Sequence, residues 1–372
     1  MNTIAIASKP SLGVIYISSI LQGFKANRLL YASTAVVFLA AVAEALLLGL
    51  PMSFGMVFIF SVPVISILTL MIAFGLGLET VRLARTRYAG PLFPALWHKT
   101  RDDYFAPQRV ANAVHATVYM TLFMVGYTFI KNAIPTANPY AWDKAFMEWD
   151  RVLHFGVHPY EWLAPIFNIP AITWLTNWNY NLWFAVMFGL WFWQGFSRND
   201  HKQRQQFLLS FGFTWFLGGG ILGTVFSSVG PCFYGRLLPA EIDPYGPLMA
   251  WLNHVNTTHT VFALNVMDEL WKSYATGDGL FNGISAMPSM HVGTSVIFAF
   301  LGFASGQRWL GWMLAAFASF IMLGSVHLGW HYAIDGYLGA AIAVFSWWLA
   351  GRLVDWDRAA RGIAESRSFS NC

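Results

Sequence analysis

Charged residues and cysteines are both scarce in this chain of 372 residues. Asp, Glu, Lys and Arg make up only 11% of it, whereas a soluble domain carries about 25%, so too little charge is present to cover a water-facing surface. The two cysteines, Cys232 and Cys372, lie far apart in unlike surroundings, which argues against a disulfide framework. The first long apolar run begins near Leu29 and exceeds the apolar region of a signal peptide, so we expect it to remain as a helix.

Hydrophobic residues are correspondingly abundant, at 56% of the chain, and they recur in runs of about 20, the length that crosses a bilayer as a helix. The sequence predicts an all-α polytopic membrane protein with about eight transmembrane helices, at 29–50, 56–79, 112–133, 170–195, 206–229, 288–305, 308–327 and 331–351. We expect three regions: an amino-terminal segment with two spans and a basic cytoplasmic loop (1–111), a six-helix catalytic core (112–351) and a cytoplasmic tail (352–372).

The distribution of Lys and Arg predicts the orientation, because cytoplasmic loops retain positive charge. With the amino terminus in the cytoplasm, Lys9 and Arg198 fall inside with most of the 22 Lys and Arg, and the outer residues are Lys131, Lys144, Arg151, Arg236 and Lys272. Both termini are therefore predicted to be cytoplasmic, in an inner or plasma membrane. This topology also accounts for the formal charge of +4 without nucleic-acid binding.

Two short motifs carry candidate chemistry: Pro288-Ser289-Met290-His291, and His331 followed four residues later by Asp335. The two apolar segments between them, 288–305 and 308–327, are predicted to form a hairpin of membrane helices. Such a hairpin returns the chain to the side it left, so His291 and His331 should meet at the extracytoplasmic face.

The spacing of these residues suits phosphoryl transfer by a histidine. At the start of the last predicted span, His331 and Asp335 would share one helical face, where the carboxylate can fix the tautomer and orientation of the imidazole. His291 would lie in the first turn of a helix that begins at Pro288. Free backbone N–H groups at a helix amino terminus bind phosphate, here around Ser289 and Met290.

Other interpretations remain open at this stage. The spacing of His327, His331 and Asp335 is also typical of a metal site, as in a metal-dependent membrane oxidase or hydroxylase. A transporter or scaffold could keep the fold without catalysis. Ionisable side chains at a membrane span nevertheless indicate function, and here three converge.

The two motifs resemble the second and third motifs of the type 2 phosphatidic acid phosphatase superfamily, over roughly 112–351. The wording Ser-Ala-Met-Pro-Ser-Met-His, with His-Tyr-x-x-Asp, is most similar to the branch of inositol phosphorylceramide synthases. The resemblance implies a six-helix core and metal-independent chemistry without a cofactor. It implies that His331 forms a phosphohistidine, that Asp335 orients it, and that His291 protonates the departing oxygen.

The sequence lacks the phosphate-binding arginines of that pattern. No Arg-Pro dipeptide occurs, and Gly324-Ser325 replaces the Ser-Arg that usually opens the third motif. Arg236 and His327 are therefore the expected side-chain phosphate ligands. The substrate would be a phospholipid or a polyprenyl- or sphingolipid-type phosphate whose tail comes from the bilayer. Water as acceptor would make a phosphatase, and a polyol or lipid alcohol a phosphotransferase; the missing arginines favour transfer.

Overall fold

The computed structural model describes residues 11–52, 56–197, 201–239, 242–277 and 283–369. Lys9, Arg198 and Cys372, which were used above, lie outside the described residues. Within those ranges the chain forms helices and no β-strand, so the predicted all-α class is confirmed.

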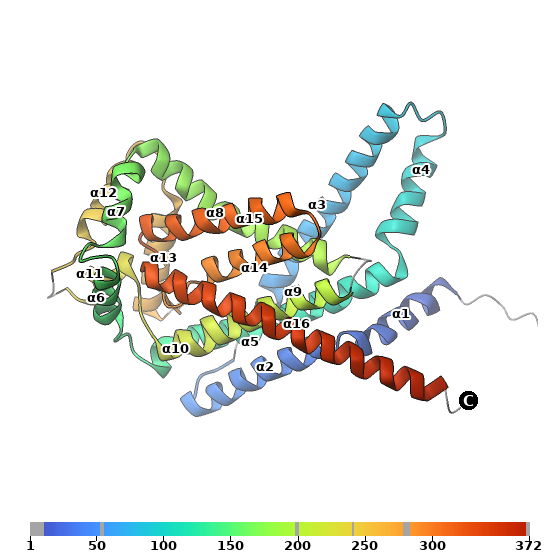
Figure 1. Cartoon of the computed structure of the whole chain (residues 1–372), viewed down its shortest axis with the longest axis horizontal. Helices are drawn as coiled ribbons and strands as arrows, with labels where there is room; N and C mark the ends of the chain where they lie inside the picture. The colour runs from blue at the N-terminus through green and yellow to red at the C-terminus, as the bar shows by residue number, and fades with distance from the viewer. Residues whose placement is uncertain (1–10, 53–55, 198–200, 240–241, 278–282, 370–372) are drawn as a thin grey trace, which may run out of the picture.

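Most of the mass lies in long helices. They are α2 (Arg28–Leu48), α3 (Met56–Arg85), α5 (Pro107–Ala137), α8 (Pro170–Gly195), α14 (Met290–Ala304), α15 (Arg308–His327) and α16 (Ala333–Phe369). Of these, α3 projects away from the others at a steep angle (Figure 1). Residues 352–369 of the predicted cytoplasmic tail continue α16 as a helix.

A further long run is continuous but changes its winding. It consists of α9 (His201–Phe213), the π-helical segment η2 (Thr214–Leu222) and α10 (Gly223–Val225), where the sequence predicted one plain helix at 206–229. The glycines in η2 allow close approach, because a Cβ at Gly218 would lie 2.5 Å from Met290 Cε and one at Gly219 would lie 2.3 Å from the Tyr127 hydroxyl. The absence of side chains at these glycines therefore lets α5 and α14 pack against this run.

Shorter helices fill the connections. They are α1 (Leu12–Ala26), α4 (Leu92–Lys99), η1 (Thr100–Tyr104), α6 (Asp143–Leu153), α7 (Pro159–Phe167), η3 (Pro231–Phe233), α11 (Tyr234–Leu237), α12 (Gly246–Asn256) and α13 (Phe262–Thr276). The predicted outer loops, 134–169 and 230–287, are thus largely helical where described.

Five helical segments of the described chain are long and apolar enough to cross a membrane: Arg28–Leu48, Pro107–Ala137, Lys202–Val225, Arg308–His327 and Ala333–Gly362. They coincide with five of the eight predicted spans. Two of the others form α3 and α8. The third, α14, has 15 residues and rises only about 22 Å, less than the roughly 30 Å hydrocarbon core. A polytopic membrane protein is confirmed, and the count of eight crossings stays a prediction.

The predicted hairpin is present as α14 and α15. It turns at Gly306, whose φ of 77° lies in the left-handed region that favours glycine. Near the turn a Cβ on Gly302 would lie 2.8 Å from Gly311 Cα, so the absence of both side chains lets the two helices touch. The hairpin therefore places the start of α14 and the end of α15 at the same end of the molecule.

The two ends of the molecule differ. The carboxyl-terminal part of α16 lies at the same end as α1, whereas α6, α7, α11 and α12 gather at the opposite end (Figure 1). Arg28, the first residue of α2, forms an ion pair with Asp357 of α16, which ties the first and last long helices together. The end with the short helices is the end at which the two histidine motifs lie.

Candidate active site

His331 lies in the connection between α15 and α16, not on a helix. Gly329 has a φ of 75°, and the backbone N–H groups of Trp330 and His331 both donate to the Ser325 carbonyl, at 3.0 and 3.2 Å. This turn closes the end of α15, and α16 begins only at Ala333. The expectation that His331 opens the last helix is therefore wrong.

The His331 ring is nonetheless held in one orientation. Its Nδ1 atom is 2.8 Å from the Ala286 carbonyl oxygen and 3.3 Å from Asp335 Oδ2. Because a carbonyl oxygen only accepts, Nδ1 must carry the proton, and the neutral ring then presents a bare lone pair at Nε2. Asp335 Oδ2 also accepts from the Tyr332 N–H at 3.0 Å. The expected contact between His331 and Asp335 thus forms across the start of α16 rather than along one helical face.

His291 is the second residue of α14 and lies against aromatic rings of α8. Its ring stacks on Tyr180 with centroids 4.6 Å apart and lies 4.2 Å from the Trp183 ring, while Trp183 Nε1 donates to the His291 carbonyl at 3.1 Å. The His291 and His331 ring centroids are 6.5 Å apart. The sequence prediction that both histidines meet is therefore confirmed.

The amino terminus of α14 adds backbone donors. The helix begins at Met290, two residues later than expected, because Ser289 is its N-cap and accepts from the Val292 N–H at 3.4 Å. The first helical backbone bond runs from Gly293 to the Ser289 carbonyl. The N–H groups of Met290 and His291 consequently lack intrahelical acceptors, which is the arrangement that binds anions.

Two aspartates of α6 clamp the His331 connection from the outside. Asp143 accepts hydrogen bonds from Val229 N, Gly230 N and the Tyr332 hydroxyl at 3.0, 2.9 and 2.9 Å. Asp150 accepts from the N–H groups of Ala333 and Ile334 at 3.0 and 3.2 Å, so a carboxylate already caps the amino terminus of α16. Burial raises the pKa of both carboxyls.

These aspartates were missed in the sequence. Asp143 and Asp150 are seven residues apart, which is two helical turns and hence one face, and both side chains are almost fully buried. Acidic residues at that spacing in a short amphipathic helix were the available signal, since a buried carboxylate requires partners.

A lysine of α5 also acts on the site. Burial lowers the pKa of His331 to about 3, and the positive charge of Lys131 contributes to this shift. The hydrogen bond to the Ala286 carbonyl raises the pKa and opposes part of the shift. The described loop that reaches Ala286 crosses α5 at this point, with Gly283 N donating to Asn132 Oδ1 at 3.3 Å. His331 is therefore neutral at physiological pH and lies within the field of a cation. The sequence placed Lys131 on the outer side but assigned it no role.

The two expected side-chain phosphate ligands have other partners. Arg236 Nη2 is 2.6 Å from Asp268 Oδ1, and its guanidinium lies over the rings of Phe233 and Trp271. His327 is the last residue of α15, and its Nε2 atom is 2.9 Å from Thr173 Oγ1 of α8. Arg236 is thus paired with an exposed carboxylate, and His327 with a buried hydroxyl of α8.

The structure does not place the three residues of the possible metal site on one helix. His327 ends α15, His331 lies in the connection and Asp335 belongs to α16, so the spacing does not put the three residues on one face. Among the described residues, no group of three or more His, Cys, Asp or Glu side chains is placed to hold a metal ion.

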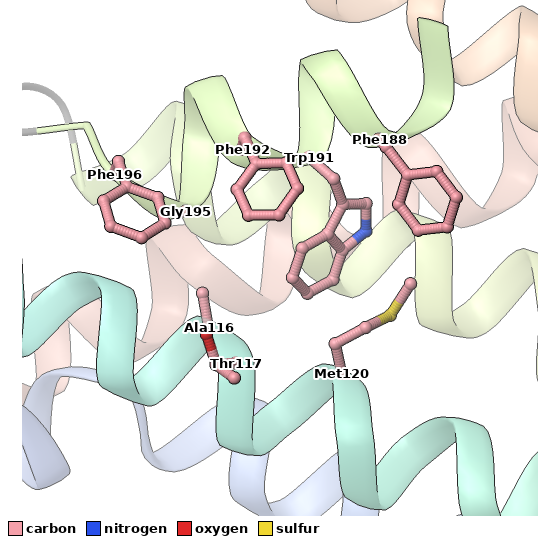
Figure 2. A pocket seen from close by; sticks show the side chains of 8 residues that line it. All are labelled: Ala116, Thr117, Met120, Phe188, Trp191, Phe192, Gly195 and Phe196. Carbon is pink, nitrogen blue, oxygen red and sulfur yellow. The ribbon is translucent and has the colours of Figure 1, made fainter. Parts of the chain in front are cut away.

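A small cleft lies between α5 and α8 (Figure 2). Its lining consists of Ala116, Thr117, Met120, Phe188, Trp191, Phe192, Gly195 and Phe196. At about 20 Å³ it holds about one water molecule, so it is too small for a substrate and marks the seam between two helices.

Fold and site together define a polytopic helical membrane protein with two facing histidines, one oriented by a carboxylate, beside the amino terminus of a helix. The sequence model of the PAP2 superfamily matches residues 144–349, more than half of the chain. The protein belongs to this superfamily and is a membrane enzyme of phosphate-ester chemistry. No curated protein and no solved structure matches the chain. Helix α5, which carries Lys131, precedes the matched region.

Proposed function

We propose that the protein transfers the phosphoryl group of a membrane lipid through a phosphohistidine on His331. The observation that carries this proposal is the Nδ1 hydrogen bond to the Ala286 carbonyl at 2.8 Å, which leaves Nε2 as an oriented lone pair. A nucleophile must be unprotonated to attack, and burial of His331 keeps it neutral.

The reaction divides into two balanced steps. In the first, His331 Nε2 attacks phosphorus, a P–N bond forms and the P–O ester bond breaks. His291 gives the departing oxygen a proton that it takes up when the anionic phosphate binds. In the second, His291 takes the proton of the acceptor hydroxyl, whose oxygen attacks phosphorus as the P–N bond breaks. Asp335, through Oδ2, stabilises the charge on the His331 ring in between.

The phosphate oxygens require donors and a cation. We assign the backbone N–H groups of Met290 and His291, which Ser289 positions as the N-cap, and the ammonium of Lys131, whose charge reaches His331. Arg236 remains a second candidate for the cation, after release from Asp268, and His327 a weaker one through its second ring nitrogen. The proposal needs no metal ion or cofactor.

We further propose that the site faces the extracytoplasmic side of an inner or plasma membrane, with both termini in the cytoplasm. The supporting observation is that α1 and the end of α16 lie opposite the histidine end (Figure 1). The excess of Lys and Arg in the segments at the terminal end agrees with this orientation.

The acceptor is proposed to be a hydroxyl of a polyol or a lipid alcohol, as in the inositol phosphorylceramide synthase branch; water is the alternative. The motif wording and the replacement of the phosphatase arginines support transfer. A phosphatase can let water attack the phosphohistidine in the second step. A transferase must instead favour attack by an alcohol over attack by water.

Product analysis tests the proposal. Purified protein would receive phosphate-labelled phosphatidic acid, phosphatidylinositol or polyprenyl phosphate, with and without ceramide and inositol as acceptors. We expect His331→Ala to abolish both labelled phosphate release and new labelled lipid, and His254→Ala, an exposed histidine of α12, to leave turnover unchanged. A new lipid product identifies a transferase, and phosphate alone a phosphatase. Turnover that survives His331→Ala contradicts the proposal.

A further inference from the structure

A large apolar groove starts at the end of α14 and α16 that carries the candidate active site. It has a volume of about 510 Å³ and is lined by α14, α15 and α16, within the range of ligand pockets. Two of its lining residues, Val292 and Gly336, are the immediate chain neighbours of His291 and Asp335. The groove therefore starts in the same first helical turns of α14 and α16 that carry His291 and Asp335.

Small side chains create this groove. Ala299 of α14 and Ala318 of α15 are buried in its floor, and Ala315 and Ala340 also line it. Phe303, Leu323 and Tyr337 form an exposed rim, so the hollow opens on the surface of the helix bundle. In a protein that spans a membrane, such a surface faces the acyl chains of the lipids.

The groove has a direction and a length. Along α14 it extends from Val292 to Phe303, a rise of about 16 Å at 1.5 Å per residue, or roughly half of the 30 Å hydrocarbon core. Along α15 it extends from Leu323 to Ala315, a rise of about 12 Å, so Ala315 lies at the end far from the histidines. An acyl chain that hangs from a headgroup at the histidines would run down one leaflet in the same direction.

We infer that the groove between α14, α15 and α16 binds an acyl chain of the phosphate-bearing lipid and sets the chain length that the enzyme prefers. The inference rests on the proposed function, because it places the lipid phosphate at His331. Tyr337 lines the groove two residues after Asp335, and its hydroxyl is 2.9 Å from His154 Nε2 of α6. This pair forms the polar edge at which the apolar tail gives way to the headgroup.

Two pairs of neighbouring alanines allow a matched test. Ala315 lines the deep end of the groove and Ala316 points away on the same helix; Ala340 lines the upper part and Ala341 is exposed. We expect Ala315→Phe to reduce kcat/KM for dioleoyl phosphatidic acid about tenfold or more, while dioctanoyl and dibutyryl phosphatidic acid keep wild-type values. Ala340→Phe, nearer the site, should also exclude the dioctanoyl lipid.

The controls Ala316→Phe and Ala341→Phe should leave all three substrates unchanged. Equal effects of the groove variants on long and short chains, or no effect on either, would overturn the inference. A second readout is independent of turnover: photo-crosslinking of wild type and variants in phosphatidylcholine vesicles that contain phosphatidic acid with a diazirine in its acyl chain.

We expect crosslinks in peptides of α14, α15 and α16, reduced several-fold in Ala315→Phe but not in Ala316→Phe. Such crosslinks without any turnover of phosphatidic acid by the wild type would support the groove and contradict phosphatidic acid as a substrate. Crosslinks elsewhere, or equal in both variants, would overturn the groove even if turnover is found.

Discussion

The Tyr332 hydroxyl donates a hydrogen bond of 2.9 Å to Asp143 Oδ1, although 189 residues separate the two in sequence. Asp143 also accepts from the backbone at Val229 and Gly230, so one buried carboxylate joins α6, the connection before α16 and the loop after α10. The position of His331, the residue before Tyr332, depends on this junction.

Removal of the junction should destabilise the protein strongly. Asp143→Ala leaves three buried donors without an acceptor, and we expect a loss of on the order of 3 kcal/mol in unfolding free energy. Tyr332→Phe removes one donor and should cost about 1 kcal/mol. Melting temperatures of the purified variants in detergent check this, with the double variant as the test of coupling: additive effects would contradict a direct bond.

The cation assignment gives a direct comparison of two residues. Lys131→Met should lower kcat/KM by about a hundredfold or more, since it removes a charge that stabilises the transferring phosphoryl group, and Lys131→Arg should restore part of the activity. Arg236→Ala should have a small effect, because its guanidinium is paired with Asp268. The exposed Lys272 of α13 supplies the control Lys272→Met. A larger loss in Arg236→Ala than in Lys131→Met would reverse the assignment.

Stability should fall in acid because of His331. Its pKa is about 3 in the folded protein and about 6.5 in the unfolded chain, so between these values the unfolded chain binds more protons. The unfolding free energy therefore decreases as pH falls from about 6.5 toward 3. Asp143 and Asp150, whose pKa values burial raises, act in the opposite direction.

The difference between wild type and His331→Asn isolates this contribution. Asparagine does not titrate and can still donate to the Ala286 carbonyl, so the variant should lose less stability than wild type on going from pH 7 to pH 4. Thermal unfolding at several pH values provides the measurement. Parallel pH profiles of the two proteins would show that His331 is not held neutral.

Asp150 offers a test of positioning at the start of α16. Its two oxygens accept from Ala333 and Ile334. Asp150→Asn keeps one acceptor and should retain part of kcat. Asp150→Leu keeps no acceptor, so the connection that carries His331 loses its anchor. We expect its fold decrease in kcat to be at least ten times its fold increase in KM. Rescue by the conservative variant distinguishes positioning from bulk packing. Equal activities of the two variants would contradict the role.

Local patterns in the sequence were sufficient for the hairpin. The apolar lengths, the turn at Gly306 and the return of the chain all follow from neighbouring residues, and they bring His291 to His331 without knowledge of other contacts. The predicted start of α14 at Pro288 is two residues early, although the N-cap contact of Ser289 is equally local, spanning three residues.

Other features depend on distant partners. The start of α16 at Ala333 is fixed by Asp150, 183 residues earlier, so the periodicity of 331–351 alone placed His331 on the helix incorrectly. The packing of Tyr127 and Met290 against the glycines of η2 joins residues far apart in the chain, and Lys131 acts on the site from a helix that carries no recognised motif. Such contacts are tertiary, and no local pattern encodes them.

The most direct test of the account is a search for the phosphohistidine itself. Purified protein in detergent would receive the phosphate-labelled lipids and be quenched at alkaline pH, with wild type compared with His331→Ala and His291→Ala. We predict acid-labile, alkali-stable label on the wild-type peptide that contains His331, none on His331→Ala, and slowed formation on His291→Ala. Turnover by the wild type with label on another residue, or retained by His331→Ala, would contradict the central claim.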